Sequence, residues 1–174
     1  FLNWSEVQLT QAGVLSPRLD SEILLAHALK LSRIQLFTHS KRTLNETERK
    51  YAEINVKRRR KREPVSLITG HQEFWSLDFV VDANVLIPRP ETELLIETAL
   101  SCISPASNNV LDLGTGSGVL ALVMAKEVVD SKVTALENDP KALNIAKKNA
   151  TNHGMRDRIK FLCKDLRKED WDGP

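Results

Sequence analysis

Apolar positions recur with a helical period through the first sixty residues of the sequence. The clearest case is the segment RLDSEILLAHALKL, in which leucine, isoleucine and alanine return every three or four positions and line one face. Ser16 is expected to cap this helix, and Pro17 stands at the first helical position, where its missing N–H costs no hydrogen bond. The pattern therefore predicts an amphipathic helix that packs against neighbouring helices.

Two further helices are expected around this one. Asn3 or Ser5 can cap a short helix that ends near Gly13, and TLNETERKYAEINVKRRRKRE carries Asn45 and Glu48 at the spacing of a capping box. The region has no glycine-rich loop and no catalytic motif. We therefore expect a small helical bundle over residues 1–64.

The pattern changes after Pro64. EFWSLDFVVD alternates and is rich in aromatic and β-branched residues, which predicts a hairpin over residues 72–82 within a connector at 65–88. Its Phe74 and Trp75 either pack on the following domain or form part of a substrate rim, and packing is favoured because aromatic side chains contribute strongly to cores. A rigid Pro-Arg-Pro turn follows, after which a helix is expected to about residue 103.

Strand and helix alternate from residue 109 onward. NVLDL, KVTALE and IKFLCKD are expected to be strands, and residues 118–129 and 140–153 are expected to be helices. Asp139, Pro140 and Gly154 bound the second helix as cap, first residue and stop. This order is typical of parallel strands with crossover helices, so an open α/β domain is expected over 89–174.

The amino-acid composition excludes only a few classes of protein. The chain has 174 residues, of which 41% are hydrophobic and 28% charged, which argues against a disordered or fibrous protein. Its net charge is +2, so no overall field points to nucleic acid. The two cysteines and four histidines match no metal or redox spacing, and no apolar run suggests a membrane span or signal peptide. We expect a cytoplasmic protein without a metal.

The basic run KRRRKR at residues 57–62 has two interpretations. It could contact RNA or an acidic patch on a protein partner. It could also be the solvated end of a helix, where positive charge is favourable next to the C-terminal dipole. The second is preferred because no aromatic residue interleaves with the run.

Three glycines at alternate positions, Gly114, Gly116 and Gly118, follow the strand NVLDL and enclose Thr115 and Ser117. A phosphate loop of the ATPase kind needs a lysine and a hydroxyl residue after the last glycine, and here valine and leucine stand there. A dinucleotide loop spaces its glycines G-x-G-x-x-G, and here the third comes one residue early. Neither of these two nucleotide loops fits.

Acidic residues at the strand ends indicate a different ligand. Asp112, two positions before the first glycine, would repel a pyrophosphate but suits the ammonium and sulfonium of S-adenosyl-L-methionine. Glu137 closes the next strand and could accept both ribose hydroxyls, and Asp165 closes the third and could accept from the adenine amine, with Leu166 beside the ring. Caps and tight turns are the alternative explanation, but three acids at consecutive strand ends favour a cofactor site.

Three longer segments, REPVSLITGHQEFWSLDFVV, LIPRPETELLIETAL and VLDLGTGSGVLAL, together resemble the bacterial release factor glutamine methyltransferases, the HemK or PrmC proteins. The resemblance implies a helical substrate-recognition domain, a hairpin and a Rossmann-like methyltransferase domain. It implies methyl transfer from S-adenosyl-L-methionine to the glutamine of the Gly-Gly-Gln motif in release factors. Cofactor contacts then fall on the residues named above, and Arg89, Pro90 and Glu91 help to close the site.

The resemblance also implies an Asn-Pro-Pro-Tyr motif that positions the acceptor nitrogen, and the sequence contains no such tetrapeptide. We therefore expect the catalytic residues beyond residue 174, and we expect this fragment to be inactive alone. The full-length protein is expected to be a monomer. VLDL is typical of a strand with neighbours on both sides, so an open edge here would invite self-association. An adenine N6 methyltransferase acting on DNA and a non-catalytic binding module are the alternative functions, and direct nucleic-acid binding is not expected.

Overall fold

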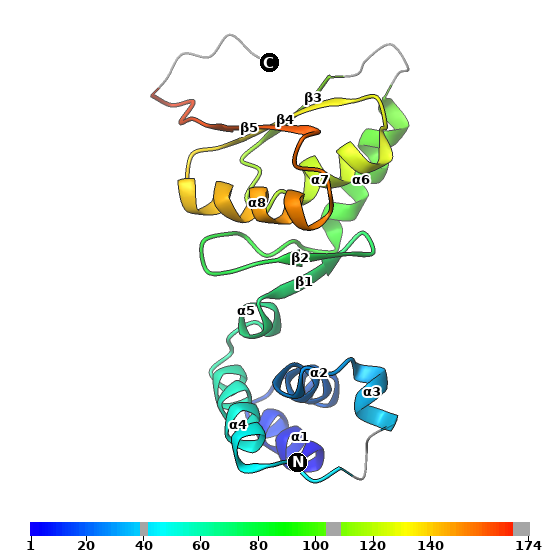
Figure 1. Ribbon diagram of the computed structural model, residues 1–174. Helices are drawn as coiled ribbons and strands as arrows, with labels where there is room; N and C mark the ends of the chain where they lie inside the picture. The colour runs from blue at the N-terminus through cyan, green and yellow to red at the C-terminus, as the bar shows by residue number, and fades with distance from the viewer. Residues whose placement is uncertain (39–41, 104–108, 169–174) are drawn as a thin grey trace. The chain divides into compact units, whose positions relative to one another are not determined.

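The computed structural model describes residues 1–38, 42–103 and 109–168 of the chain. The chain divides into two compact units, Phe1–Gly70 and His71–Pro174 (Figure 1). No helix among the described residues is long and apolar enough to cross a membrane.

The N-terminal unit is a bundle of short helices. Its elements are α1 (Leu2–Gln11), α2 (Pro17–Leu29), α3 (Arg33–Thr38), α4 (Glu46–Arg60) and α5 (Val65–Thr69). The three expected helices are confirmed as α1, α2 and α4, and Leu9, Leu24 and Val56 from these helices form one buried cluster. The short helices α3 and α5 were not predicted, because six and five residues are too few to display a helical period.

The helix starts agree with the sequence in part. The capping box of α4 is confirmed, with Glu48 N donating to Asn45 Oδ1 at 2.9 Å and Asn45 N donating to the Glu48 carboxylate at 3.0 Å. Ser16 precedes Pro17 as expected, but its side chain makes no capping hydrogen bond. The caps expected at Asn3 or Ser5 are wrong, because α1 begins at Leu2. Burial of the first two apolar side chains against the bundle outweighs a cap that is worth about 1 kcal/mol.

Two arginines of the basic run hold the bundle together. Arg59 Nε donates to Asp20 Oδ2 of α2 at 2.7 Å, and its Nη1 donates to the Glu63 carbonyl at 3.0 Å. Arg58 is paired with the Glu63 carboxylate and donates to the Leu67 carbonyl of α5 at 3.3 Å. These two arginines therefore tie the end of α4 to α2 and α5, which the expected solvated helix end did not include.

The C-terminal unit contains a hairpin and a parallel sheet. The hairpin strands β1 (His71–Phe74) and β2 (Leu77–Val80) pair antiparallel, and α6 (Glu91–Cys102) follows. Then come β3 (Asn109–Leu113), α7 (Val119–Glu127), β4 (Lys132–Glu137), α8 (Pro140–Asn152) and β5 (Ile159–Cys163). The strands β3, β4 and β5 are parallel and lie in that order, so the expected open α/β arrangement is confirmed.

One face of this sheet carries the core of the unit. Val110, Val133 and Ile159 stand in register across the three strands and belong to the main apolar cluster, together with residues of α7 and α8. Both helices lie on the same side of the sheet (Figure 1). On the opposite face of β3, Leu111 and Leu113 are 37% and 55% exposed. Among the described strands β3 pairs with β4 alone, so the open edge expected at this strand is present, and the two leucines lie on the sheet face beside it.

The hairpin packs within the compact unit that begins at His71. Phe74 and Phe79 are 2% and 0% exposed within the main core of that unit. Trp75 N donates to Glu93 Oε1 of α6 at 2.8 Å, and Trp75 Nε1 donates to Glu127 Oε1 of α7 at 3.0 Å. The packing expected for the two aromatic residues is therefore present, and the structure divides the chain after Gly70, between the two boundaries expected from the sequence.

Candidate functional site

The glycine loop joins the carboxyl end of β3 to the start of α7. Gly114, Gly116 and Gly118 have positive φ angles of 72°, 56° and 85°, a region that L side chains rarely adopt. The N–H groups of Gly114 and Thr115 both donate to the Leu136 carbonyl of β4, at 2.8 and 3.0 Å. The loop is thus folded back on the neighbouring strand, and its shape requires glycine at these three positions.

Asp112 lies beneath this loop and is 8% exposed. Its Oδ2 accepts from the Thr115 hydroxyl at 2.6 Å and from Ala121 N of α7 at 3.2 Å. Among the described residues, no hydrogen bond reaches Oδ1. Burial raises the pKa of this carboxyl, against the lowering effect of its two hydrogen bonds. Asp112 therefore organises the loop with one oxygen, and no described residue engages the other.

Glu137, at the end of β4, is 9% exposed and faces the loop from the neighbouring strand. Its Oε2 accepts from Gly116 N at 2.9 Å, and its Oε1 accepts from the N–H groups of Asn138 and Asp139 at 2.8 and 3.1 Å. A carboxylate offers about four lone-pair sites, so about one is left for a ligand. The expected acceptance of two ribose hydroxyls would require a rearrangement of these contacts.

Asp165 follows β5 and is engaged by neighbouring cations. Its two oxygens accept from Arg167 Nε and Nη2, both at 2.9 Å, and Lys168 Nζ lies 3.5 Å from Oδ2. The Arg167 guanidinium holds the pKa of this carboxyl well below its usual range. The adjacent Leu166 is 42% exposed and is available to cover an apolar ring.

Arg89, Pro90 and Glu91 are all exposed. The carbonyls of Arg89 and Pro90 accept from Thr92 N and Glu93 N, which starts α6. Within the described ranges, no hydrogen bond or ion pair joins these three residues to the glycine loop. Their expected part in closing the site therefore stays a prediction.

Helix α8 supplies two contacts to the loop that the sequence analysis missed. A Cβ on Gly118 would lie 3.0 Å from Ala146 Cβ and 3.2 Å from Ala146 Cα, so the loop and this helix approach too closely for any larger residue. One turn later, Asn149 Nδ2 donates to the Ser117 carbonyl at 2.8 Å. The helical period of the apolar residues places both Ala146 and Asn149 on the buried face of α8, but it does not reveal which segment packs against that face.

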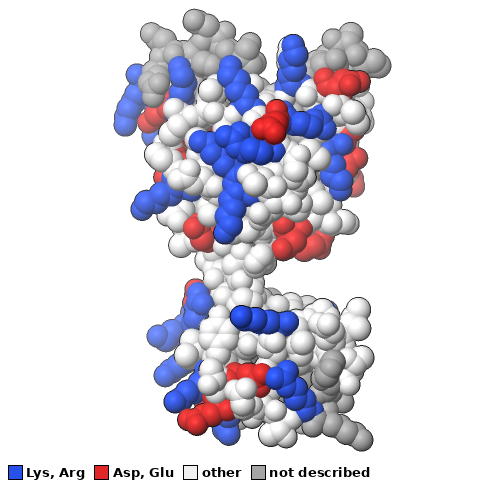
Figure 2. Space-filling view, in the orientation of Figure 1, with Lys and Arg blue, Asp and Glu red and all other residues white. Residues whose placement is uncertain are grey.

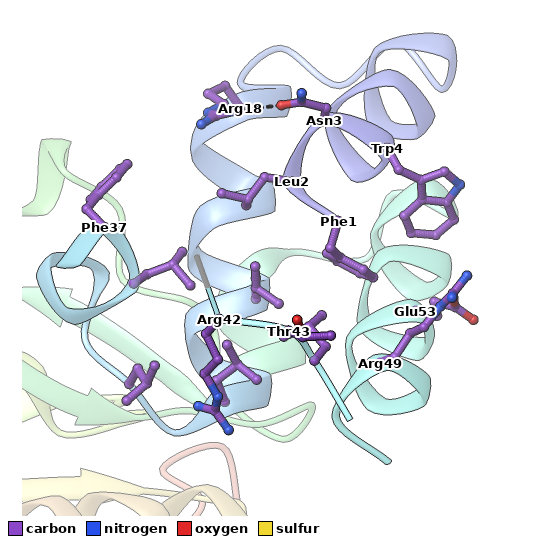
Figure 3. A pocket seen from close by; sticks show the side chains of 15 residues that line it. Phe1, Leu2, Asn3, Trp4, Arg18, Phe37, Arg42, Thr43, Arg49 and Glu53 are labelled. Atoms are coloured by element: carbon purple, nitrogen blue, oxygen red, sulfur yellow. Dashed lines mark hydrogen bonds and ion pairs between the residues drawn. The ribbon is translucent and has the colours of Figure 1, made fainter. Parts of the chain in front are cut away.

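A separate pocket of about 710 Å³ lies in the N-terminal unit. Trp4 and Phe37, which are 44% and 51% exposed, lie on opposite sides of it in Figure 3. The arginines that line it are already paired with glutamates, as in the ion pair of Arg18 with Glu22. The pocket is thus apolar with neutralised charges at its margin and carries no catalytic pair.

Charge is unevenly distributed although its sum is small. Residues 71–137 contain three lysines and arginines against ten acidic residues, whereas residues 138–168 contain nine against three. Figure 2 shows lysines and arginines gathered over the visible face of the C-terminal unit, with fewer acidic side chains among them. The carboxylate of Asp165 is occupied because two cations of this basic segment, Arg167 and Lys168, lie against it. Among the residues that the structure describes, no cluster could hold a metal ion.

Two family models match the chain. The PrmC N-terminal domain matches residues 1–70, and the methyltransferase small domain matches residues 90–173. The release factor glutamine methyltransferase of Rhodopirellula baltica is 42% identical over 170 residues, which cover 95% of this chain and 57% of that protein. That of Koribacter versatilis is 44% identical over 160 residues, covering 91% and 56%. The chain thus spans a little over half the length of these relatives.

Solved structures are more distant. A tRNA (uracil-54, C5)-methyltransferase of Pyrococcus abyssi, solved in complex with S-adenosyl-L-homocysteine, has a TM-score of 0.49 at 15% identity, covering 59% of this chain and 25% of that one. The sequence relatives therefore carry the comparison.

Proposed function

Because the chain belongs to the release factor glutamine methyltransferase family, we propose that its glycine loop binds S-adenosyl-L-methionine for methyl transfer to a release factor. The acceptor would be the side-chain amide nitrogen of the glutamine in the Gly-Gly-Gln motif. When bound, the cofactor supplies an electrophilic methyl group on a positively charged sulfur. The residues of this chain bind and orient that group.

The observation that carries the proposal is the free side of the Asp112 carboxylate. Its Oδ2 is committed to Thr115 and Ala121, so the side chain is fixed while Oδ1 keeps its lone pairs. A Cβ built on Gly114, the first loop glycine, would meet no atom within 4 Å. A buried, oriented acceptor beside open space fits the ammonium of the methyl donor, because a charge-assisted hydrogen bond is strongest where water is excluded.

The remaining strand ends would hold the nucleoside. Glu137 keeps about one lone-pair site and fixes Gly116, so we propose that it binds one ribose hydroxyl and holds the loop against the sugar. Asp165 and Leu166 would contact the adenine, with the amine competing with Arg167 for the carboxylate. Arg89, Pro90 and Glu91 would close the site from the start of α6.

We propose no residue of this chain for holding the acceptor nitrogen. The 174 residues contain no Asn-Pro-Pro-Tyr sequence, the motif that the family uses for this purpose. The assignment is therefore restricted to binding of the methyl donor and recognition of the protein substrate.

The N-terminal unit is proposed to recognise the release factor. Its pocket presents two exposed aromatic side chains, Trp4 and Phe37, on opposite sides (Figure 3), and several leucines also line it. Aromatic residues of this kind are enriched where protein partners bind. Phe37→Ala should weaken binding of a release factor, measured by surface plasmon resonance, and leave the affinity for the cofactor unchanged.

Calorimetry tests the cofactor site directly. S-adenosyl-L-methionine titrated into the 174-residue chain should bind, and Glu137→Ala should weaken binding about tenfold or more, because one charge-assisted hydrogen bond and the anchor of the loop are lost. Asn144→Ala, at an exposed position of α8, is the control. Absence of binding by the unaltered chain would refute a preformed site.

The transfer itself is tested with the full-length gene product. Incubation with S-adenosyl-L-methionine and a release factor should add one methyl group to the peptide that contains Gly-Gly-Gln, as detected by mass spectrometry. An unmodified glutamine would refute the proposed substrate, and methylation of DNA instead would favour the adenine methyltransferase alternative.

A further inference from the structure

Asn149 joins two segments that are far apart in the sequence. It lies on α8 with a relative exposure of 0%. Its Nδ2 donates to the Val80 carbonyl at 3.0 Å and to the Ser117 carbonyl at 2.8 Å, and its Oδ1 accepts from Val80 N at 2.8 Å. Both amide hydrogens and the amide oxygen are therefore used. The side chain pairs with β2 of the hairpin as a neighbouring strand would, and it also binds the glycine loop.

The contact with Ser117 fixes one peptide plane of the loop. The Ser117 carbonyl accepts from Asn149, and the N–H of the same peptide group, on Gly118, donates to the Thr115 carbonyl at 2.8 Å. Both polar atoms of this peptide group therefore have hydrogen-bond partners, and Ser117 is 2% exposed. Rotation of the peptide would leave a buried carbonyl without a donor, which is costly in the interior.

Two other anchors of the loop come from the end of β4. Gly114 and Thr115 are held by the Leu136 carbonyl, and Gly116 is held by Glu137. Asn149 also holds the hairpin, so movement of β2 and movement of the loop would both break hydrogen bonds of this one side chain.

We propose that Asn149 is a positioning residue for the methyl-donor loop, which couples the conformation of that loop to the seating of the hairpin. The inference rests on the proposed function of the loop. Asn149 acts through Ser117 and Gly118, and needs no contact with the ligand. Loss of its donor group removes its hydrogen bond to Ser117 and one of its two hydrogen bonds to Val80. The loop should therefore be released, while Trp75 still holds the hairpin against α6 and α7.

Asn149→Asp tests this with the least change in shape. The carboxylate keeps an acceptor for Val80 N but opposes the carbonyls of Val80 and Ser117, to which Asn149 donated. His153→Ala is the matched control, because His153 Nε2 donates to the Asp78 carbonyl at 2.8 Å and so holds the same hairpin from the same helix. No described hydrogen bond of His153 reaches the loop.

The first readout is the dissociation constant for S-adenosyl-L-homocysteine, measured by calorimetry. The conditions are those under which circular dichroism shows that both variants are folded. Asn149→Asp should raise it about tenfold, the equivalent of about one hydrogen bond, and His153→Ala should leave it within about twofold. Equal effects of the two variants would show that Asn149 only stabilises the hairpin, and would overturn the proposal.

The second readout needs no ligand. Hydrogen exchange of the Gly116 and Gly118 amides, followed by NMR, should accelerate in Asn149→Asp and not in His153→Ala. Unchanged exchange would refute the positioning role, whatever the chain binds. If exchange accelerates while the unaltered chain fails to bind S-adenosyl-L-homocysteine, the positioning role stands and the proposed function of the loop is wrong. Asn149→Ala, which removes the repulsion, provides the same comparison if the aspartate variant does not fold.

Discussion

Gly118 gives the sharpest test of how the loop is built, because alanine there meets two separate obstacles. The residue has a φ of +85°, and a left-handed conformation costs a residue with a Cβ about 1–2 kcal/mol. The added Cβ would also lie 3.0 Å from Leu122 Cδ1 and 3.0 Å from Ala146 Cβ. Overpacking of this kind costs about 1–3 kcal/mol. Gly118→Ala should therefore lower the free energy of unfolding by about 2–5 kcal/mol.

Gly154 separates the two contributions. Its φ is +67°, and a Cβ there would meet nothing within 4 Å, so Gly154→Ala should lose only the conformational part, about 1–2 kcal/mol. Urea unfolding of both variants and the parent, followed by circular dichroism, measures the difference. If Gly118→Ala is no less stable than Gly154→Ala, the close packing of the loop on α8 does not exist as described.

Other substitutions separate structural from ligand-binding roles. Gly114→Ala should lower the free energy of unfolding no more than Gly154→Ala does, because no atom lies within 4 Å of the added Cβ. Calorimetry should nevertheless show weaker binding of S-adenosyl-L-methionine. An unchanged affinity would show that the ligand does not occupy the space beside Gly114. Burial raises the pKa of Asp112, so the parent should lose stability relative to Asp112→Asn as the pH rises from the ordinary value of 3.8. Urea unfolding between about pH 4 and about pH 7 measures the free energy of unfolding of both proteins. A constant difference between the two across this range would contradict the prediction. Arg59→Met should cost on the order of 3 kcal/mol in thermal or urea unfolding, because it leaves a nearly buried aspartate unpaired, whereas the exposed Arg60→Met should stay within about 0.5 kcal/mol.

The elements that could be predicted from the sequence are those with strong local signals. The capping box at Asn45 and Glu48, the boundaries of α8 and the glycine turns each depend on residues a few positions apart. Their order then implied a parallel sheet. The first helix began earlier than its polar residues suggested, because burial of apolar side chains decided its start.

The parts that could not be predicted depend on tertiary contacts. Asn149 is buried and Asn144 is exposed on the same helix. The helical period places Asn149 on the apolar face, but it does not identify Val80 and Ser117 as its partners. The three acidic strand ends were identified as candidates from their positions alone. Their individual environments differ, because Thr115 and Arg167 engage Asp112 and Asp165 from nearby in the sequence, whereas Glu137 accepts from Gly116 of the loop after β3.

The hairpin shows that the position of a segment in the sequence does not decide with which part of the protein it unfolds. Two strands of four residues each have little stability of their own, and the three helices that hold them all follow later in the sequence. Residues 71–80 therefore share the unfolding transition of the parallel sheet and not that of the helices that precede them. A protease that cuts within the hairpin would thus report on the global opening of the C-terminal unit.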